Sequence, residues 1–426
     1  MKTVTLTEYR TETAVALTPG QRRQLRGLAD SIQIEPADQG EGLFDLTPKS
    51  TIGTLRFGEL AIEIRPKLPL DRVLFMISYA LDPVRWRESL FSYAGCDSLT
   101  EALALAFARM VSRTLARGLL QGYRQEEAAR GAVRGRIRLD DQIRLHFGRV
   151  PPIEVRYDEF TADIEENRVL RAALWRLGML RLRSTETRRL LRAGRAMLDG
   201  VSLVEYDPRR LPAFTYTRLN QHYRQSVELA LLILRCLSFE QAHGAVECIA
   251  FLVDMNVVFE RFVAVALREA LKVTERSFPQ NMRGRASLYL DAARRVRLKP
   301  DLSWWDGARC VFVGDIKYKR VQTDGVLHPD LYQLLAYTLA TGLPQGMLIY
   351  AAGEGEPATH RIPLADKRLD VTALNLSGEP TSLLGEIEQI ARRIRAQRAL
   401  SPALTTADTA PPRAAYSSLE APGCSR

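Results

Sequence analysis

The spacing of apolar residues changes repeatedly between about Cys248 and residue 352, and this alternation restricts the fold more than any other feature of the chain. Residues Asp254–Leu271 have the three- and four-residue spacing of a helix. Three strand-like runs follow, "SLYLDA", "RVRLKPDLSWW" and "CVFVGDIKY", then a helical stretch over Pro329–Thr341 and a buried strand, "QGMLIYAA". The predicted order of elements is therefore α, β, β, β, α, β.

The rest of the chain divides by pattern and composition. Residues 1–70 alternate apolar and polar residues in short runs broken by Gly and Pro, which predicts a small β-rich unit. Residues 71–240 are mainly helical in pattern, with a basic, Gly-punctuated segment at Gly131–Arg144 that we expect to be extended and hairpin-like. Residues 241–400 carry the alternating elements, and the Ser-, Thr-, Ala- and Pro-rich residues 401–426 are expected to be disordered. We expect a multidomain α+β protein.

The charge of the chain favours a polyanionic partner such as DNA, because the formal net charge is +10 and neutralised phosphates release counterions. Arginine accounts for 52 of the 60 basic residues, and three of the eight lysines lie close together, at Lys299, Lys317 and Lys319. A lysine kept in such a chain indicates a position that needs a compact amine. No apolar run is long enough to span a bilayer, so we expect a cytoplasmic protein without a membrane partner.

A carboxylate and an amine share one face of the strand "CVFVGDIKY", because side chains alternate and Asp315 and Lys317 are two apart. The turn signal Asp306-Gly307 predicts a hairpin that brings Asp301 beside Asp315. Two carboxylates and a backbone carbonyl suit Mg²⁺, or Mn²⁺ in its place, and Lys317 could orient or deprotonate a water that attacks a phosphodiester. The alternative is a solvated hairpin with a weak surface ion pair.

Two further features support a site at this hairpin. Gln333 and Tyr337, four apart in the following helix, lie on one helical face. Glu260 lies at the flank of the apolar stripe of the preceding helix, where it is either a further metal or water ligand or a solvated residue. We therefore treat Asp301, Asp315 and Glu260 as candidate metal ligands.

The pattern Pro300-Asp301, Asp315-x-Lys317 and Gln333-x-x-x-Tyr337, in this order of elements, resembles the PD-(D/E)xK nuclease superfamily and its RecB-like branch. The segments "RGRIRLDDQIR", "YDEFTADIEENRVLRAAL", "VFERFV", "GDIKYKR" and "DLYQLLAYTLATGLPQGMLIY" are similar to the McrC family, the nuclease subunits of McrBC modification-dependent restriction systems. The resemblance implies a C-terminal α/β nuclease core, with Asp301, Asp315 and Lys317 in the nuclease motif and Gln333 and Tyr337 in an accessory motif.

The resemblance also implies a partner, a McrB-like AAA+ GTPase ring that recognises and translocates DNA. The chain contains no GxxxxGK[ST] sequence, so we expect it to bind no nucleotide itself. Two alternatives remain open: a free-standing RecB-like repair nuclease, and a non-catalytic scaffold or activator of an AAA+ ring. The basic segment has three interpretations, a DNA-facing ribbon, a probe into the motor ring or a solvated strand, and its arginines are Arg130, Arg134, Arg136 and Arg138.

Overall fold

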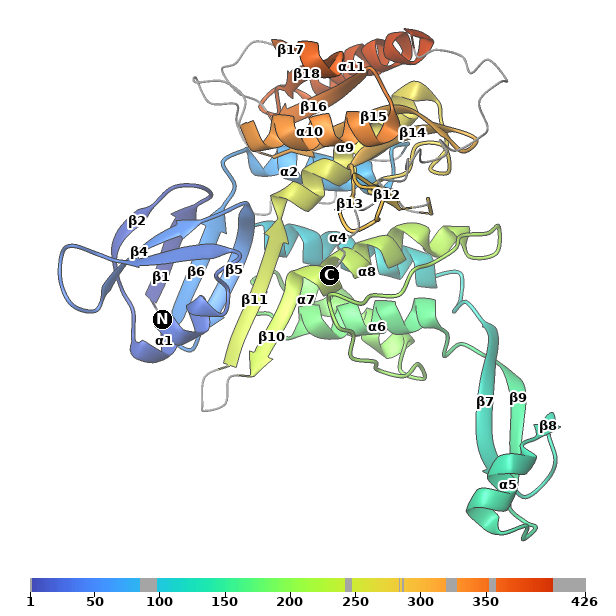
Figure 1. Ribbon diagram of the computed structural model, residues 1–426. Coiled ribbons are helices and arrows are strands. Elements are labelled where there is room, and N and C mark those ends of the chain that lie inside the picture. The colour runs from blue at the N-terminus through green and yellow to red at the C-terminus, as the bar shows by residue number, and fades with distance from the viewer. Residues whose placement is uncertain are drawn as a thin grey trace, which may run out of the picture.

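The computed structural model of the chain describes residues 2–84, 98–241, 247–282, 284–285, 287–318, 328–351 and 358–400. The tail from residue 401, for which the sequence predicts disorder, lies outside the described residues, and so does Lys319. The described part is a mixed α/β structure with several sheets and their covering helices, labelled in Figure 1. No helix in that part of the chain is long and apolar enough to cross a membrane.

The N-terminal unit is built from two sheets that share one apolar core. Leu6, Leu46 and Ile62 are fully buried there, because each strand turns alternate side chains inward. The larger sheet has the strand order β1-β6-β5-β11-β10, and the smaller sheet has the order β2-β4-β3. The elements are β1 (Lys2–Thr7), β2 (Glu12–Ala16), α1 (Pro19–Arg26), β3 (Ile32–Pro36), β4 (Leu43–Pro48), β5 (Thr51–Phe57), β6 (Leu60–Arg65), β10 (Leu237–Gln241) and β11 (Glu247–Asp254).

Two strands of the larger sheet come from much later in the chain. β10 and β11 form an antiparallel pair, and β11 lies antiparallel beside β5. A Cβ atom at Gly53 would lie 2.0 Å from the carbonyl oxygen of Phe251, so this close approach requires glycine. The sequence pattern assigns residues 241–400 to a single unit. The structure instead places β11 in the N-terminal sheet, where Ala250 completes the apolar core around Leu55.

Helices of the middle region pack into a bundle with a continuous apolar core. α4 packs against α7, and α6 packs against α8. The hydroxyl groups of Thr114 and Ser226, 2.7 Å apart, link α4 to α8 inside this core. α2 also packs on α9 of the C-terminal unit, with the rings of Phe75 and Phe262 5.4 Å apart. The elements are α2 (Leu70–Leu81), α4 (Leu99–Leu115), α6 (Glu165–Gly178), α7 (Thr185–Met197), η1 (Gln221–Tyr223) and α8 (Arg224–Cys236).

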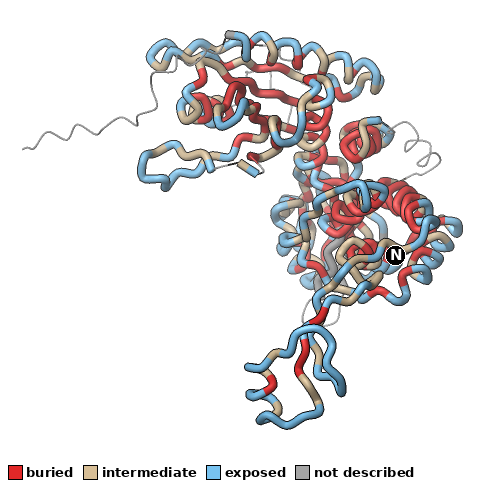
Figure 2. Tube along the Cα trace, turned by 90° about the vertical axis from the view of Figure 1, so that its right-hand side faces the viewer, coloured by how far each residue is buried: buried red, intermediate tan, exposed pale blue. Residues whose placement is uncertain are grey.

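An arm projects from this bundle, at the lower right of Figure 1. Its stem is the antiparallel pair β7 (Gly122–Arg130) and β9 (Ile153–Thr161), and β8 (Arg136–Ile137) pairs with β9 near the tip. Figure 2 shows that most of the arm is exposed. The sequence predicts an extended segment up to Arg144, but Leu139–His146 form the helix α5. Two aspartates in its first turn stabilise the helix, because their negative charges interact favourably with the positive end of the helix dipole.

The C-terminal unit is a five-stranded sheet, with the order β14-β15-β16-β18-β17, covered on both faces by helices (Figure 1). β14 and β15 form an antiparallel hairpin, whereas β15, β16 and β18 are parallel. α10 packs on one face, and α9 and α11 pack on the other. The elements are α9 (Met255–Leu271), β12 (Leu288–Tyr289), β13 (Arg297–Leu298), β14 (Leu302–Asp306), β15 (Arg309–Lys317), α10 (His328–Thr341), β16 (Gln345–Ala351), β17 (Ala358–Ile362), η2 (Pro363–Ala365), β18 (Lys367–Leu374) and α11 (Pro380–Leu400).

The hairpin at Asp306-Gly307 is confirmed, but the strand predicted over "RVRLKPDLSWW" is interrupted, and only Leu302–Asp306 joins the main sheet. β12 and β13 pair only with each other, in a two-stranded ribbon. Asp291 closes the turn between them by accepting hydrogen bonds from the backbone of Arg295 and Val296. Pro300 has no N–H group and cannot continue a ladder, so β14 begins only at Leu302.

Candidate active site

Asp315 and Lys317 lie next to each other on β15, as their spacing predicts, and their side chains form an ion pair. Asp315 is only 1% exposed, because helices cover both faces of the sheet at this strand. Ile316 points to the opposite face, into the core beneath α9 and α11. Burial alone lowers the pKa of Lys317, but the carboxylate of Asp315 outweighs this effect and raises it, so the side chain is an ammonium at neutral pH.

Asp301 lies beside this pair because the hairpin register aligns Leu302 with Gly314, one residue before Asp315. The backbone N–H of Ile316 donates a hydrogen bond to Oδ2 of Asp301 at 2.9 Å. Burial, followed by the charges of Asp315 and Glu260, raises the pKa of Asp301 to about 8. The carboxyl group of Asp301 therefore binds a proton more tightly than that of an exposed aspartate.

Glu260 approaches the same group of charges from α9. Burial and the charge of Asp315 raise the pKa of Glu260 to about 7, and the ammonium groups of Lys317 and Lys299 partly offset this rise. The flank position on the helix thus brings the half-buried carboxyl group within reach of the charges of the site.

Gln333 and Tyr337 lie on one face of α10, as expected from their spacing, and Nε2 of Gln333 donates to the Tyr337 hydroxyl at 2.7 Å. That hydroxyl donates in turn to the carbonyl oxygen of Lys299 at 3.2 Å. Burial, together with the charges of Asp315 and Asp301, raises the pKa of Tyr337, so the phenol keeps its proton. The pair therefore fixes the backbone immediately before Pro300-Asp301.

A second tyrosine and an aspartate complete the surroundings of Lys317, and neither was indicated by the sequence motifs. Tyr350 pairs with Lys317 in the parallel β15–β16 register. Its hydroxyl donates to Oδ2 of Asp330 at 2.6 Å, and the charge of Asp330 contributes to the raised pKa of Lys317. The available signal was Tyr350 itself, because a hydroxyl in a buried apolar strand needs a hydrogen-bond partner.

Three carboxyl groups, when ionised, repel one another around the single ammonium of Lys317: Asp301, Asp315 and Glu260. A divalent cation would relieve this repulsion, and all the donors are the hard oxygens that Mg²⁺ prefers. Among the residues that the structure describes, no three His, Cys, Asp or Glu side chains converge as a ready metal-binding group. The residues therefore fit a cation that takes one or two carboxylates and retains several waters.

A family model described as "McrBC 5-methylcytosine restriction system component" matches residues 46–351. The chain belongs to this McrBC family. The match covers well over half of the sequence, from within β4 of the N-terminal unit to the end of β16. It includes the six candidate site residues, which are Glu260, Asp301, Asp315, Lys317, Gln333 and Tyr337.

A solved structure of the same system resembles nearly the whole chain. It is described as a refined half-complex from a tetradecameric assembly of Thermococcus gammatolerans McrB AAA+ hexamers with bound McrC, and the likeness has a TM-score of 0.54 at 17% identity, over 92% of this chain and 100% of that chain. At 17% identity, this likeness shows that the two chains share a fold. The cryo-EM structure of the Thermococcus gammatolerans McrBC complex gives a TM-score of 0.40 at 19% identity, over 63% of this chain and 88% of that chain. The comparison with curated proteins gave no match.

Proposed function

We propose that this chain is the nuclease subunit of a McrBC-type restriction system, which cleaves DNA phosphodiester bonds with Mg²⁺. The observation that carries the proposal is the group of carboxyls around Lys317, the buried Asp315 and the half-buried Asp301 and Glu260, in a chain of a restriction-system family. A solvated hairpin would leave these carboxyl groups exposed, whereas burial raises the pKa of two of them.

Each residue has a distinct role in this proposal. Asp301 and Asp315 would hold Mg²⁺, with Glu260 as a further ligand, direct or through water. Bound there, the metal would stabilise negative charge on the phosphoryl oxygens. Lys317 is charged, so it acts by orienting the attacking water and stabilising developing charge, and it does not act as a neutral base.

Gln333 and Tyr337 position these groups without touching the reacting atoms. Their hydrogen bonds hold the carbonyl of Lys299 and thereby the backbone that presents Asp301. The charge of Asp330, which accepts a hydrogen bond from the Tyr350 hydroxyl, supports the charged form of Lys317.

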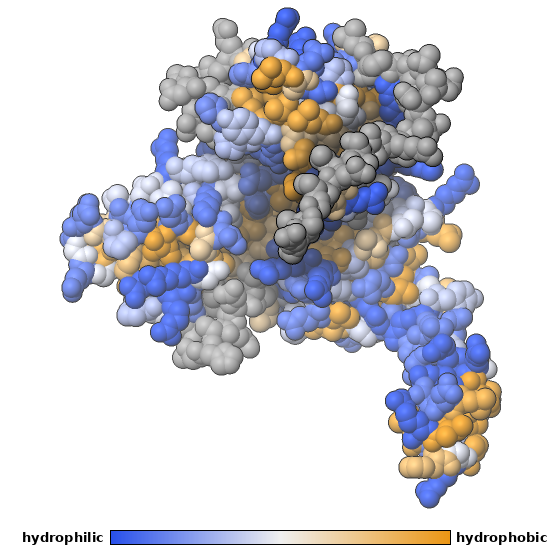
Figure 3. Space-filling model, viewed as in Figure 1, coloured by the Kyte–Doolittle hydropathy of each residue, from blue (hydrophilic) through white to orange (hydrophobic). Residues whose placement is uncertain are grey.

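The proposed partner is a McrB-like AAA+ GTPase ring, whose hydrolysis this chain would stimulate. The family and the McrB–McrC assembly that the chain resembles support this part of the proposal. The projecting arm suits insertion into a ring, because its tip exposes large apolar side chains (Figure 3). These side chains are Leu139, Ile143, Leu145, Phe147 and Val150.

Reconstitution with the AAA+ partner tests the proposal. DNA cleavage in Mg²⁺ is measured with the chain alone, with the partner and with the partner plus GTP. We expect little cleavage by the chain alone and strong cleavage only in the complete mixture. Vigorous degradation of any DNA by the lone chain would favour the free-standing repair nuclease. Partner stimulation without cleavage by the wild-type chain would favour the non-catalytic activator.

A further inference from the structure

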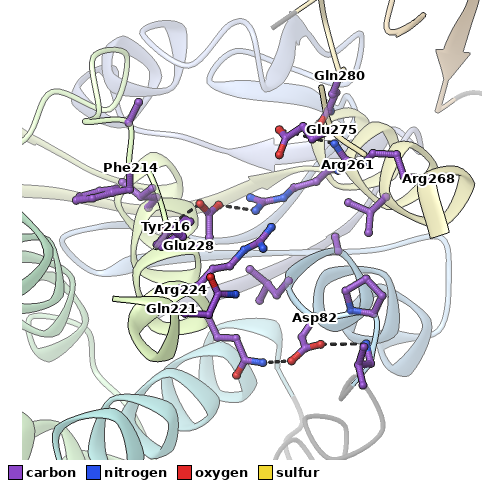
Figure 4. A pocket seen from close by; sticks show the side chains of 18 of the residues that line it. Asp82, Phe214, Tyr216, Gln221, Arg224, Glu228, Arg261, Arg268, Glu275 and Gln280 are labelled. Carbon is purple, nitrogen blue, oxygen red and sulfur yellow. Dashed lines mark hydrogen bonds and ion pairs between the residues drawn. The ribbon is translucent and has the colours of Figure 1, made fainter. Parts of the chain in front are cut away.

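A large cavity separates the helical bundle from the C-terminal unit. Its volume is about 1480 Å³, and its walls come from α4, α8 and α9 and from the segment before α8. Figure 4 shows side chains from α8, α9 and the segment before α8 pointing into the shared space, among them Glu228, Arg261 and Tyr216. The lining includes Lys299, two residues before Asp301, and Arg261, the residue after Glu260. The charge of Lys299 also acts on the carboxyl group of Glu260. The cavity therefore opens beside the candidate active site.

The lining is strongly cationic, with eight arginine or lysine side chains against four aspartate or glutamate side chains. Two of the acidic groups are already engaged: Glu228 with Arg261 at 2.5 Å and Glu275 with Arg268 at 3.7 Å. Although burial opposes it, the charge of Arg261 lowers the pKa of Glu228, so this carboxylate stays ionised and neutralises its partner. The net positive charge of the cavity therefore comes from other residues.

Five cations supply that charge, and each is exposed and has no ion pair within the part of the chain that the structure describes. They are Arg113, Arg117, Arg218, Arg224 and Lys299. Unpaired cations on separate elements repel one another when they face one space, so their convergence indicates an anionic ligand with several charges along its length. The rings of Phe214 and Tyr216 are stacked at 6.5 Å within the same cavity, and the guanidinium of Arg224 lies over the Tyr216 ring at 5.6 Å.

We propose that this cavity binds a single strand of the DNA substrate through its phosphates and delivers the strand to Asp301 and Asp315. The inference rests on the proposed nuclease function and names the path of its substrate. A basic groove with aromatic side chains is the combination that single-stranded nucleic acids require, because phosphates follow the charges and bases stack on the rings. Lys299 marks the end of the path at the active site.

Binding of a fluorescently labelled single-stranded oligonucleotide, measured by anisotropy without divalent cations, tests the inference independently of cleavage. The variant R117A/R218A/R224A removes three of the unpaired cations. We expect at least a tenfold loss of affinity, and a decrease of about 2 in the slope of log K against log salt, because each lost phosphate contact contributes about 0.7. The lysine triple variant R117K/R218K/R224K keeps the charges and should keep the wild-type slope.

The matched control is R23A/R26A/R189A, which makes the same change in net charge at exposed arginines outside the cavity. We expect its affinity to equal that of the wild type. Equal affinity of the cavity variant and the wild type would overturn the inference, and so would equal losses in the cavity and control variants or binding of duplex alone. Asp315→Asn separates this inference from the proposed function: it should bind the oligonucleotide normally, so cleavage by this variant would reject the active site and leave the cavity assignment intact.

Discussion

Tyr318 and Glu8, 310 positions apart in the sequence, are joined by a hydrogen bond in which the Tyr318 hydroxyl donates to Oε2 of Glu8 at 3.3 Å. Tyr318 follows Lys317 at the end of β15, and Glu8 follows β1. The ammonium of Lys67 lies 4.1 Å from the centre of the Tyr318 ring, a cation–π contact. The N-terminal unit therefore holds the end of the strand that carries the candidate catalytic lysine.

The burial of Glu8 makes the stability of the protein depend on pH. Burial raises the pKa of Glu8 from 4.5 to about 7, although Lys67 opposes the rise. The folded protein binds this proton more tightly than the unfolded chain, so the contribution to stability is complete below pH 4.5 and is lost as the pH rises through 7. Glu8→Gln should abolish this loss, which is about 3 kcal/mol in the free energy of unfolding.

Urea unfolding at pH 5 and pH 8 measures the effect. We expect the wild type to lose more stability than Glu8→Gln between these values, while Glu41→Gln, at an exposed position, should follow the wild type. Parallel behaviour of wild type and Glu8→Gln would contradict the buried, proton-binding state of Glu8.

Tyr337→Phe tests whether the hydroxyl positions Asp301. The change removes the hydrogen bonds to Gln333 and to the Lys299 carbonyl, so we expect stability to fall by about 1 kcal/mol. We expect the cleavage rate to fall roughly 10- to 100-fold with unchanged DNA affinity, because small displacements of reacting groups have effects of this size. Tyr332→Phe, at an exposed tyrosine of the same helix, is the matched control. An unchanged cleavage rate in Tyr337→Phe would show that the Tyr337 hydroxyl does not position Asp301.

Several relationships in this site could be predicted from sequence because they are local. The alternation of β15 places Asp315 beside Lys317, the Asp306-Gly307 turn fixes the hairpin, and helical spacing stacks Gln333 on Tyr337. Each depends only on the period of one element or on one turn.

The remaining relationships depend on contacts between distant segments. β11 pairs with β5 across about 200 residues, and Glu8 meets Tyr318 from the opposite end of the chain. No periodicity encodes such pairings, because they depend on how complete units pack. The helix α5 was missed for another reason: eight residues give only two turns, too few for a distinct helical pattern.

The four arginines of the arm differ in their surroundings, so single substitutions can separate a structural role from a role in stimulating the partner. Arg138 pairs with Glu127 and Asp141, Arg130 donates to the Tyr157 hydroxyl, and Arg134 lies over the Tyr157 ring. Arg136 is exposed and has no ion pair among the described residues. Changing all four to Ala should lower partner GTPase stimulation, because an arginine that reaches a nucleotide site can contribute about 10³ to 10⁵ in rate.

Arg136→Ala alone should account for most of this loss, and Arg138→Ala should weaken the fold of the arm instead. Partner turnover at saturating chain concentration is the measurement. Equal stimulation by the wild type and the quadruple variant would reject the probe interpretation and leave a solvated strand or a DNA-facing ribbon.

Lys317→Arg separates charge from geometry at the active site. The guanidinium keeps the positive charge but is planar and bulkier than the ammonium that pairs with the buried Asp315. We expect cleavage to fail in both Lys317→Arg and Lys317→Ala, with partner binding retained. The control is Lys272→Arg, at a lysine just beyond α9 and outside the site, which should cleave normally. If Lys317→Arg cleaved DNA at the wild-type rate, only the positive charge at this position would matter, and the shape of the amine would not.

The most direct measurement of the central claim is the initial rate of DNA cleavage by Asp315→Asn with the AAA+ partner, GTP and Mg²⁺. Asparagine is nearly isosteric with aspartate, so the variant should remain folded, and its partner binding and GTPase stimulation should match those of the wild type. The account predicts that cleavage is abolished, and that Asp301→Asn behaves in the same way. Undiminished Mg²⁺-dependent cleavage by Asp315→Asn would contradict it.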